Sequence, residues 1–308
     1  LPIRRSRGYA PFPVKLPFPL PPILAVGGEL KSTFCLTVDN HALMSQHIGD
    51  MENLETLEAF DESVAHFKSI FRVEPGLIAC DLHPGYLSAK WAAENALKSG
   101  LGVPVVQVQH HHAHIAALMA EHGLDGSQPV IGFSFDGTGY GTDGAIWGGE
   151  VLIADYRGFE RAAHLAYTPL AGGDAAVKRP YRQALAQLWA SGVEWNPLLP
   201  PVAASTESER KVLLRQFESG FNCVSTSSMG RLFDAVASLI GVRQSVTYEG
   251  QAAIEMESLA ATDSPYRADS PYRVDLLGDA PLRFDPAPLI QAIAADVLKG
   301  KPAAIIAA

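Results

Sequence analysis

The chain has 308 residues, of which 47% are hydrophobic, and this is enough apolar material for a large core or for two domains. Its formal net charge of −9 disfavours general binding to nucleic acid or to anionic membranes, because there is no basic surplus to displace counterions. No apolar run approaches the roughly 18–20 residues that span a bilayer, and the first residues lack a signal-peptide core, so we expect a soluble cytoplasmic protein.

Both ends of the chain are unusual. The first 22 residues are dense in proline, which excludes a helix or a central strand, and we interpret residues 1–22 as the tail of a preceding domain and a linker. The last residues, KPAAIIAA, stop in an apolar run without a polar tail. We therefore expect the chain to be a fragment of a longer protein.

Strands and helices alternate from residue 23 onward. ILAVGGELKSTFCLTV predicts two strands around a glycine turn, and NLETLEAFDESVAHFKSIF has the apolar spacing of a helix. LIACDLHPGY predicts a buried strand and a turn, and SAKWAAENALKSG a helix with Ser88 as its N-cap. PVVQVQ and HHHAHIAALMAEHG predict a further strand and helix, and PVIGFSFDGTGYGTDGAIWGGEVLIA predicts two strands around a glycine turn.

The second half adds three predicted helices, RPYRQALAQLWASG, ERKVLLRQFESG and MGRLFDAVASLIG. Strands that alternate with helices indicate an α/β fold with a mostly parallel sheet. Two predicted hairpins, AVGGELKSTFCL and FDGTGYGTDGAIWGGEVL, each carry a glycine turn near an acid, as hairpins do in actin-like ATPase folds. A tandem repeat, SPYRAD and SPYRVD at residues 264–275, predicts a surface loop.

Four histidines cluster in QVQHHHAHIAA. If the helix begins near His110, then His110 and His114 lie at i and i+4 on one face, a spacing that suits two imidazoles on one metal ion. His111 and His112 then point elsewhere, toward the ligands or a substrate. The alternative is an ordinary core position, which is the commoner role of a single histidine on an apolar helix. Imidazole and carboxylate ligands suit iron and zinc alike.

A third ligand is expected from a neighbouring strand end, and Asp136 is the best candidate. It follows the buried run VIGFSF and precedes GTGYG, where open α/β sheets place their sites. An Asx turn at this Asp-Gly step is the alternative explanation. Asp81 and His83 lie at another predicted strand end. The next residues open a hairpin and so fail the context of a P-loop or Rossmann motif, but we keep three of them as candidate nucleotide contacts: Gly137, Thr138 and Gly139.

Two further segments could hold a nucleotide. In PLAGGDAAVKRPYRQALA, Gly172 and Gly173 permit close backbone approach and Asp174 could accept from ribose hydroxyls. The basic residues that follow stand near a helix start, a suitable place for phosphate. SSMGRLFDAVASLIG offers Gly230 and Asp234, which otherwise cap and solvate a helix.

Taken together and in this order, the motifs resemble the HypF family of hydrogenase maturation factors. IRRSRGYAP is similar to the end of its YrdC-like domain. Its TsaD-like carbamoyltransferase domain is matched by AVGGELKSTFCL, SQHIGDMENLET, DLHPGYLS, VQHHHAHIAA, FDGTGYGTDGAIWGGE, KRPYRQALA, SSMGRLFDAVASLIG and YEGQAAIEME. The resemblance implies a YrdC-like tail and linker at 1–22 and a TsaD-like domain at 23–308, with lobes at about 23–150 and 151–308. Its fold would be α/β of the two-lobed ASKHA (actin-like) class, incomplete at the C-terminus.

The resemblance also implies an ATP-dependent carbamoyltransferase. In this family, carbamoyl phosphate and ATP give carbamoyl-adenylate, and the TsaD-like part moves the carbamoyl group to the C-terminal cysteine of HypE. The product becomes the cyanide ligand of nickel-iron hydrogenase. Carried over by motif, the metal ligands are His110, His114 and Asp136, and the nucleotide contacts are Gly172, Gly173, Asp174, Gly230 and Asp234. We expect Asp136, His111 and His112 to be catalytic, with a divalent metal (iron or zinc), bound ATP or carbamoyl-adenylate, and magnesium as a further option.

This sequence departs from the family pattern in what it lacks. The acylphosphatase-like and zinc-finger parts, most of the YrdC-like domain and a final segment with an acidic metal ligand are missing. We therefore expect the fragment alone to be inactive, with a metal site one ligand short. The three cysteines lie outside the matched site motifs and are expected to be core thiols, with the acceptor thiol on the partner: Cys35, Cys80 and Cys223.

Three alternatives stay open. A sugar kinase or phosphatase of the same superfamily needs a catalytic acid but no HxxxH pair. A non-catalytic metal-binding or partner-docking module binds metal without nucleotide. The sister family that makes threonylcarbamoyl-adenosine in tRNA also uses HxxxH, but the acidic balance and the HHHAH, DGTGYGTDG and RPYR segments argue against tRNA as partner.

Overall fold

The computed structural model describes residue 10 and residues 12–98, 102–260 and 272–308. The IRRSRGYAP segment and the SPYRAD–SPYRVD repeat lie almost wholly outside the described residues. The chain divides into a first unit, Leu1–Gly132 with Ile153–Phe159, and a second unit, Phe133–Leu152 with Glu160–Ala308. The chain passes between the units after Gly132, Leu152 and Phe159, so strands β7 (Val130–Tyr140) and β8 (Ile146–Ala154) each contribute residues to both units. The assignment of two lobes stays a prediction.

The first unit is built on a six-stranded sheet in the order β1-β4-β3-β2-β5-β6. These strands are β1 (Val14–Lys15), β4 (His41–Met44), β3 (Cys35–Val38), β2 (Ile23–Ala25), β5 (Leu77–Asp81) and β6 (Val105–Val108). Only β2–β5 and β5–β6 pair in parallel, and the three other pairs are antiparallel. The prediction of a mostly parallel sheet is therefore wrong, because short hairpin connections from β2 to β4 give antiparallel neighbours.

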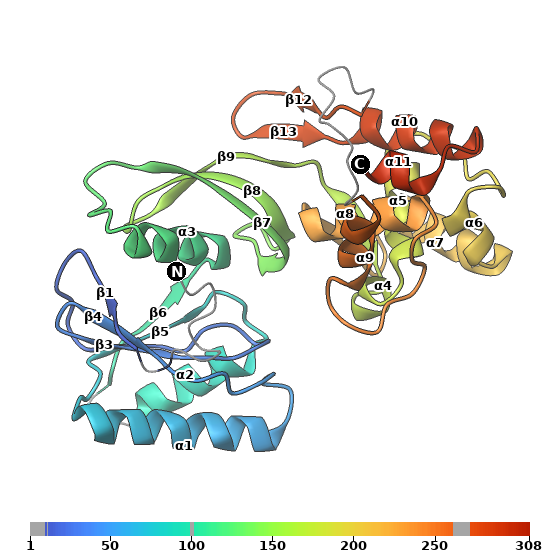
Figure 1. Ribbon diagram of the computed structural model, residues 1–308. Coiled ribbons are helices and arrows are strands. Elements are labelled where there is room, and N and C mark those ends of the chain that lie inside the picture. Colours follow the sequence, from blue (N-terminus) through green and yellow to red (C-terminus); the bar gives the residue numbers. More distant parts are fainter. Residues whose placement is uncertain (1–9, 11, 99–101, 261–271) are drawn as a thin grey trace. The chain divides into compact units, whose positions relative to one another are not determined.

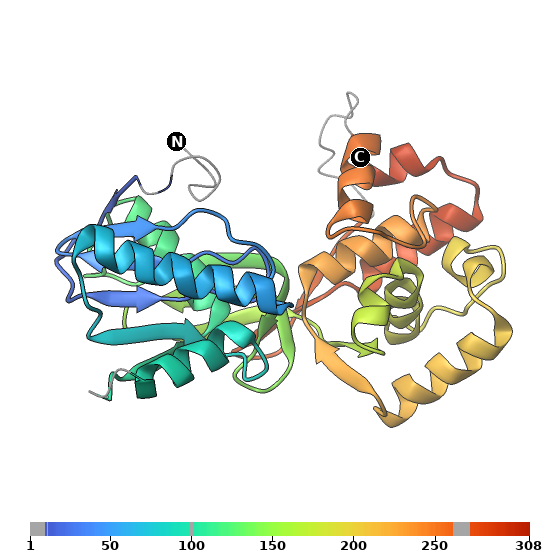
Figure 2. The ribbon, with the colours of Figure 1, turned by 90° about the horizontal axis from the view of Figure 1, so that it is seen from below.

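Helices cover both faces of this sheet. Helices α1 (Leu54–Phe71) and α2 (Leu87–Lys98) lie on one face and α3 (His110–Glu121) lies on the other (Figure 1). Figure 2 shows α1 running across its face of the sheet. Phe34 packs edge-on against Phe60 and Phe67 of α1, with ring centroids 5.6 and 4.9 Å apart. Burial of each such side chain contributes about 1.5–3 kcal/mol, so these aromatic residues fix α1 on the sheet.

The start of α2 differs from the prediction. The helix begins at Leu87, so Ser88 lies inside it and is not the N-cap. The Ser88 hydroxyl instead donates to the carbonyl of Gly27 at 3.3 Å. The Leu87 amide donates to Glu29 Oε2 at 2.7 Å, and a carboxylate is favourable at the positive end of a helix. The Glu29 carboxylate, from the loop between β2 and β3, therefore binds the start of α2 in place of a local cap.

The second unit contains a seven-stranded mixed sheet in the order β10-β11-β8-β9-β13-β12, with β7 also paired to β8. The further strands are β9 (Phe159–Leu165), β10 (Thr168–Ala171), β11 (Cys223–Thr226), β12 (Asp275–Leu277) and β13 (Leu282–Asp285). Pairs β11–β8 and β9–β13 are parallel, whereas β10–β11 and β12–β13 are antiparallel. This sheet is mixed as well.

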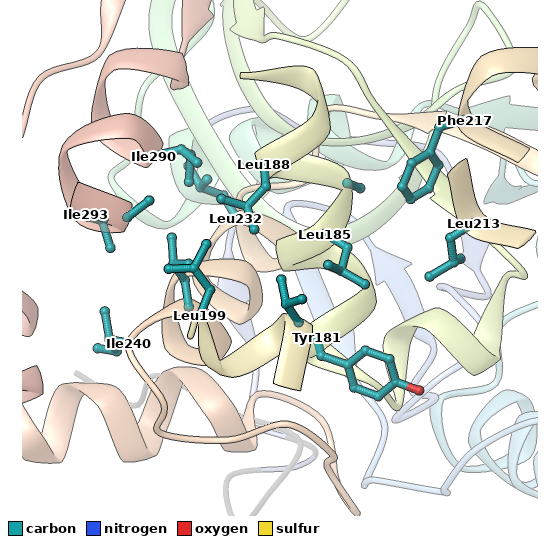
Figure 3. Close-up of a cluster of buried hydrophobic side chains, with 14 of the residues drawn as sticks. Tyr181, Leu185, Leu188, Leu199, Leu213, Phe217, Leu232, Ile240, Ile290 and Ile293 are labelled. Atoms are coloured by element: carbon teal, nitrogen blue, oxygen red, sulfur yellow. The ribbon is translucent and has the colours of Figure 1, made fainter. Parts of the chain in front are cut away.

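A helical layer supplies the core of the second unit. It consists of α4 (Asp174–Val177), α5 (Pro180–Ala190), α6 (Pro200–Ala204), α7 (Glu207–Ser219), α8 (Met229–Leu239), α9 (Gln251–Ala260), α10 (Ala287–Leu298) and α11 (Ala303–Ala307). Leu185 and Leu188 of α5 are fully buried, and Leu232 of α8 and Ile290 of α10 belong to the same cluster (Figure 3). No helix in the described ranges is both long and apolar enough to cross a bilayer.

Candidate functional site

The histidine pair lies at the start of α3, directly after β6. Helix α3 begins at His110, as predicted, and Gln109 is its N-cap, with its Oε1 accepting from the His112 amide at 2.9 Å. The Nε2 atoms of His110 and His114 are 3.0 Å apart. Two nitrogens that each bind one divalent ion at about 2.1 Å are separated by roughly 3 Å at a right angle and by roughly 3.4 Å in tetrahedral geometry. The pair is therefore arranged as two ligands of one ion would be.

Asp81 holds one of these imidazoles. Its side chain is buried at the end of β5, and its Oδ2 lies 2.8 Å from His110 Nδ1. Its Oδ1 accepts from the His83 amide, also at 2.8 Å. A carboxylate beside Nδ1 keeps the proton there and leaves the Nε2 lone pair free to bind a metal. Sequence analysis noted Asp81 only as an acid at a strand end. The parallel pairing of β5 with β6 is what brings it to His110.

The other two histidines make contacts within the first unit. His111 is completely buried, and its Nδ1 lies 3.2 Å from Gln109 Nε2. His112 donates from Nε2 to the carbonyl of Asp155 at 2.6 Å, and its ring packs against Phe159. These contacts hold α3 to its cap and to the turn after β8. The catalytic assignment of both residues stays a prediction.

A pocket of about 420 Å³ opens beside the histidine pair, within the first unit. Ala113 and Ala117 line it from α3, and these small side chains at i and i+4 leave space between the helix and the sheet. The remaining lining is mainly apolar, with Gly27, Gly28, Asp81, His110 and His114 completing it. A concave, mostly apolar surface with a few convergent polar groups is typical of a small-molecule or side-chain binding site.

Asp136 does not lie at a strand end. Strand β7 continues through the glycines to Tyr140, because these residues pair with β8 instead of forming a turn. The strand-end interpretation is therefore wrong. Asp136 is half-buried, and its Oδ1 accepts from the Gly137 amide at 2.6 Å. It belongs to the second unit and the histidines to the first, so its assignment as third metal ligand stays a prediction.

The start of α8 packs closely on this part of β7. A Cβ on Gly230 would lie 2.9 Å from Gly137 Cα, so this contact requires glycine. Ser228, the N-cap of α8, donates to the carbonyls of Asp136 and Gly137 at 3.0 and 2.8 Å. Gly137 and Gly230 therefore have a packing role. Thr138 is exposed and Gly139 buried within the strand, and the nucleotide role of these residues stays a prediction.

A buried arginine lies beside the same turn. Arg231 is 7% exposed, and its Nη2 is 3.1 Å from Asp234 Oδ2. Burial raises the pKa of the Asp234 carboxyl, and the Arg231 charge opposes that shift. Within the described residues, Arg231 Nε makes no hydrogen bond. A buried donor of this kind is costly to leave unpaired, and an anion would satisfy it.

The GGD turn precedes α4. Gly172 and Gly173 have φ of +88° and +53°, a region that favours glycine, and Asp174 is exposed. A Cβ on Gly173 would meet no atom within 4 Å, so the space beside it is open. Arg182 is one of the basic residues after this turn that we expected near a phosphate, and its Nε and Nη2 donate to Glu209 Oε1 at 2.9 and 2.6 Å. Its charge is therefore largely compensated.

Two family models match most of this chain. Residues 132–308 match the family model described as “Carbamoyltransferase, Kae1-like Domain, second subdomain”, and residues 19–121 match “HypF Kae1-like domain”. The chain belongs to the HypF family. Both the predicted family and the predicted α/β fold class are confirmed, apart from the mostly parallel sheet.

Several HypF relatives are similar over most of the chain. Carbamoyltransferase HypF2 of Cupriavidus necator is 46% identical over 260 residues, which is 84% of this chain and 31% of the relative. Carbamoyltransferase HypF of Rhodobacter capsulatus is 41% identical over 303 residues, which is 95% of this chain and 38% of the relative. The chain thus spans about a third of the length of these two relatives.

Two solved HypF structures share the fold. Full-length HypF in a phosphate- and nucleotide-bound form matches with a TM-score of 0.87 and 43% identity, over 98% of this chain and 38% of that one. The T. kodakarensis HypF structure matches with a TM-score of 0.83 and 37% identity, over 99% of this chain and 40% of that one. The arrangement of strands and helices is therefore that of HypF.

Proposed function

We propose that this chain is the carbamoyl-transferring part of a HypF-type carbamoyltransferase. It would move a carbamoyl group from carbamoyl-adenylate, made from carbamoyl phosphate and ATP, to the C-terminal cysteine of HypE. The thiocarbamate would supply the cyanide ligand of nickel-iron hydrogenase. The observation that carries the proposal is the Asp81–His110–His114 arrangement inside a HypF-family fold.

A divalent ion, iron or zinc, would be held by His110 and His114, with Asp136 as third ligand directly or through water. The donor set fits such an ion, because two imidazole nitrogens converge and the first is oriented by a buried carboxylate. When bound, the ion supplies Lewis acidity for a carbonyl. Asp81 would fix the tautomer of the His110 imidazole.

The nucleotide would be held in the second unit. Arg231 Nε is a buried donor beside the start of α8, where the backbone amides favour an anion. The open GGD turn permits backbone approach, with Asp174 available to ribose hydroxyls, and magnesium would accompany the phosphates. The solved relative in a phosphate- and nucleotide-bound form supports nucleotide binding in this family.

The transfer requires attack of a thiol sulfur on the carbamoyl carbon, with the nucleotide phosphate as leaving group. The thiol proton must pass to a base, and the oxyanion that forms must be stabilised. His111 and His112 are candidates, but their contacts with Gln109 and Asp155 favour a role in holding α3.

The test uses a chimera in which this chain replaces the matching segment of the Rhodobacter capsulatus relative. With carbamoyl phosphate, ATP and HypE, intact-mass spectrometry should detect carbamoylated HypE. The His110→Ala, His114→Ala double variant should lose this product, and elemental analysis should find less metal in it than in the unmodified chimera, whose zinc-finger metal is common to both. Equal metal content and equal transfer in the double variant would place the site elsewhere. ATP turnover without carbamoyl transfer would instead favour a kinase-like or phosphatase-like activity.

A further inference from the structure

A buried ion pair lies next to the turn that starts α8. Glu150 of β8 is 0% exposed, and its Oε2 accepts from Arg161 Nε of β9 at 2.6 Å. Its other oxygen, Oε1, accepts from the Ser227 hydroxyl at 2.5 Å. The Arg161 guanidinium also lies over the Trp147 ring, 3.9 Å from its centroid. Every part of this network belongs to the second unit.

Ser227 connects the ion pair to the candidate anion site. Its amide donates to the carbonyl of Ile146 at 2.9 Å, so both its backbone and its side chain are fixed by β8. The next residue, Ser228, caps α8 and binds the carbonyls of Asp136 and Gly137. A displacement of Ser227 would therefore move the first turn of α8 relative to β7.

Stability alone does not explain why a fully buried glutamate is paired with a partly buried arginine here. A buried ion pair is often no more stabilising than apolar side chains of the same volume, because both charges lose their hydration. This pair does hold its surroundings in one geometry, because Arg161 also donates to the Tyr167 and Ser227 hydroxyls and Glu150 also accepts from Ser227. Ser228, the residue after Ser227, accepts from the Arg231 amide through its hydroxyl. The buried Nε of Arg231 has no hydrogen-bond partner within the described residues.

We propose that Glu150, Arg161 and Ser227 are positioning residues for the phosphate of the bound nucleotide. The ion pair orients Glu150, Glu150 fixes the Ser227 hydroxyl, and Ser227 sets the turn that presents the α8 amides and Arg231 to the anion. This inference rests on the proposed nucleotide site in the second unit. Sequence analysis assigned these residues no role, because the strand pairing that joins them connects positions 77 residues apart.

The experiment measures ATP and AMP affinity of the 308-residue chain by calorimetry, together with its melting temperature. Ser227→Ala should weaken nucleotide binding about tenfold, the size expected when a hydrogen bond to a charged group is lost. Ser225→Ala is the matched control, because it removes an exposed hydroxyl from β11, two residues before Ser227. Ser227→Thr, which restores the hydroxyl, should recover affinity.

Arg161→Lys provides a second variant, since it keeps the charge but not the guanidinium geometry that orients Glu150. It should weaken binding as well. Unchanged affinity in Ser227→Ala and Arg161→Lys, with or without a lower melting temperature, would show that the network serves only stability. If the unmodified chain binds neither nucleotide, the proposed nucleotide site itself is wrong and the positioning role falls with it.

Discussion

The Oδ2 atom of Asp81 lies 2.8 Å from Nδ1 of His110, although the two residues are 29 positions apart. This contact exists because β5 and β6 are parallel neighbours, so Asp81 at the end of β5 and His110 just after β6 meet at one edge of the sheet. It leaves His110 Nε2 directed at His114 Nε2. The first unit therefore carries the two proposed metal ligands and a carboxylate that contacts one of them.

Asp81→Asn should weaken metal binding by about 10–100-fold, the effect of removing a carboxylate that orients a histidine ligand. The neutral amide holds the imidazole proton on Nδ1 less firmly, so Nε2 is less available. Affinity for zinc, measured by competition with a chelator, gives the result. Asp61→Asn is the control, because Asp61 accepts from Trp91 on the same unit and lies apart from the histidines. Equal affinity in both variants would contradict the role of Asp81.

Gly173→Val should weaken ATP binding while the fold survives, because a side chain would enter the open space beside the GGD turn. The substitution also strains the backbone, because φ of +53° with ψ of −126° is a conformation that favours glycine. Gly192→Val separates the two effects, since Gly192 has φ of +67° and equally open surroundings. Calorimetry should show reduced ATP affinity for Gly173→Val only. The same affinity in both variants would rule out a nucleotide contact at this turn.

His164 should make stability depend on pH. Burial lowers the pKa of this imidazole, and the nearby Arg161 charge adds to the effect. The unfolded chain, with an ordinary pKa near ~6.5, then binds more protons than the folded chain at acidic pH. The contribution of neutral His164 to the free energy of unfolding is therefore complete above pH ~6.5, and it is lost as the pH falls toward the lowered pKa of His164 in the folded chain.

Urea unfolding at pH 7.5 and at pH 5.5 checks this dependence. His164→Phe removes the titrating group, so the variant should lose less of its free energy of unfolding on acidification than the unmodified chain does. His66→Phe, at an exposed position of α1, is the comparison. If His164→Phe and the unmodified chain lose the same free energy, His164 does not contribute.

The three cysteines should not accept the carbamoyl group. Burial raises the pKa of Cys35 to about 12 and also raises those of Cys80 and Cys223, so each thiol stays protonated near neutral pH. Replacing all three with alanine in the chimera should leave HypE carbamoylation intact. Peptide mass spectrometry that found a carbamoyl adduct on any of them would overturn this expectation.

The sequence could predict those parts of the site whose residues lie close together along the chain, on one helix. The i, i+4 spacing of His110 and His114 becomes a shared helix face as soon as α3 forms, and the Nε2 atoms then converge. The same applies to α1, whose apolar spacing alone predicts its buried face. The order of motifs along the chain was also sufficient to indicate the HypF family.

The tertiary structure decided the contacts that arise from strand pairing, and it decided which of two possible groups binds a given backbone amide. Ser88 has the sequence of a cap, but Glu29 takes that place from another loop. Asp136 precedes glycines typical of a turn, yet pairing with β8 keeps them in the strand. The contacts of Asp81 with His110, and of Glu150 with Ser227, join distant positions. Local spacing is set by the geometry of one element, whereas these neighbours are set by which strands pair and in what register, and that is a property of the whole sheet.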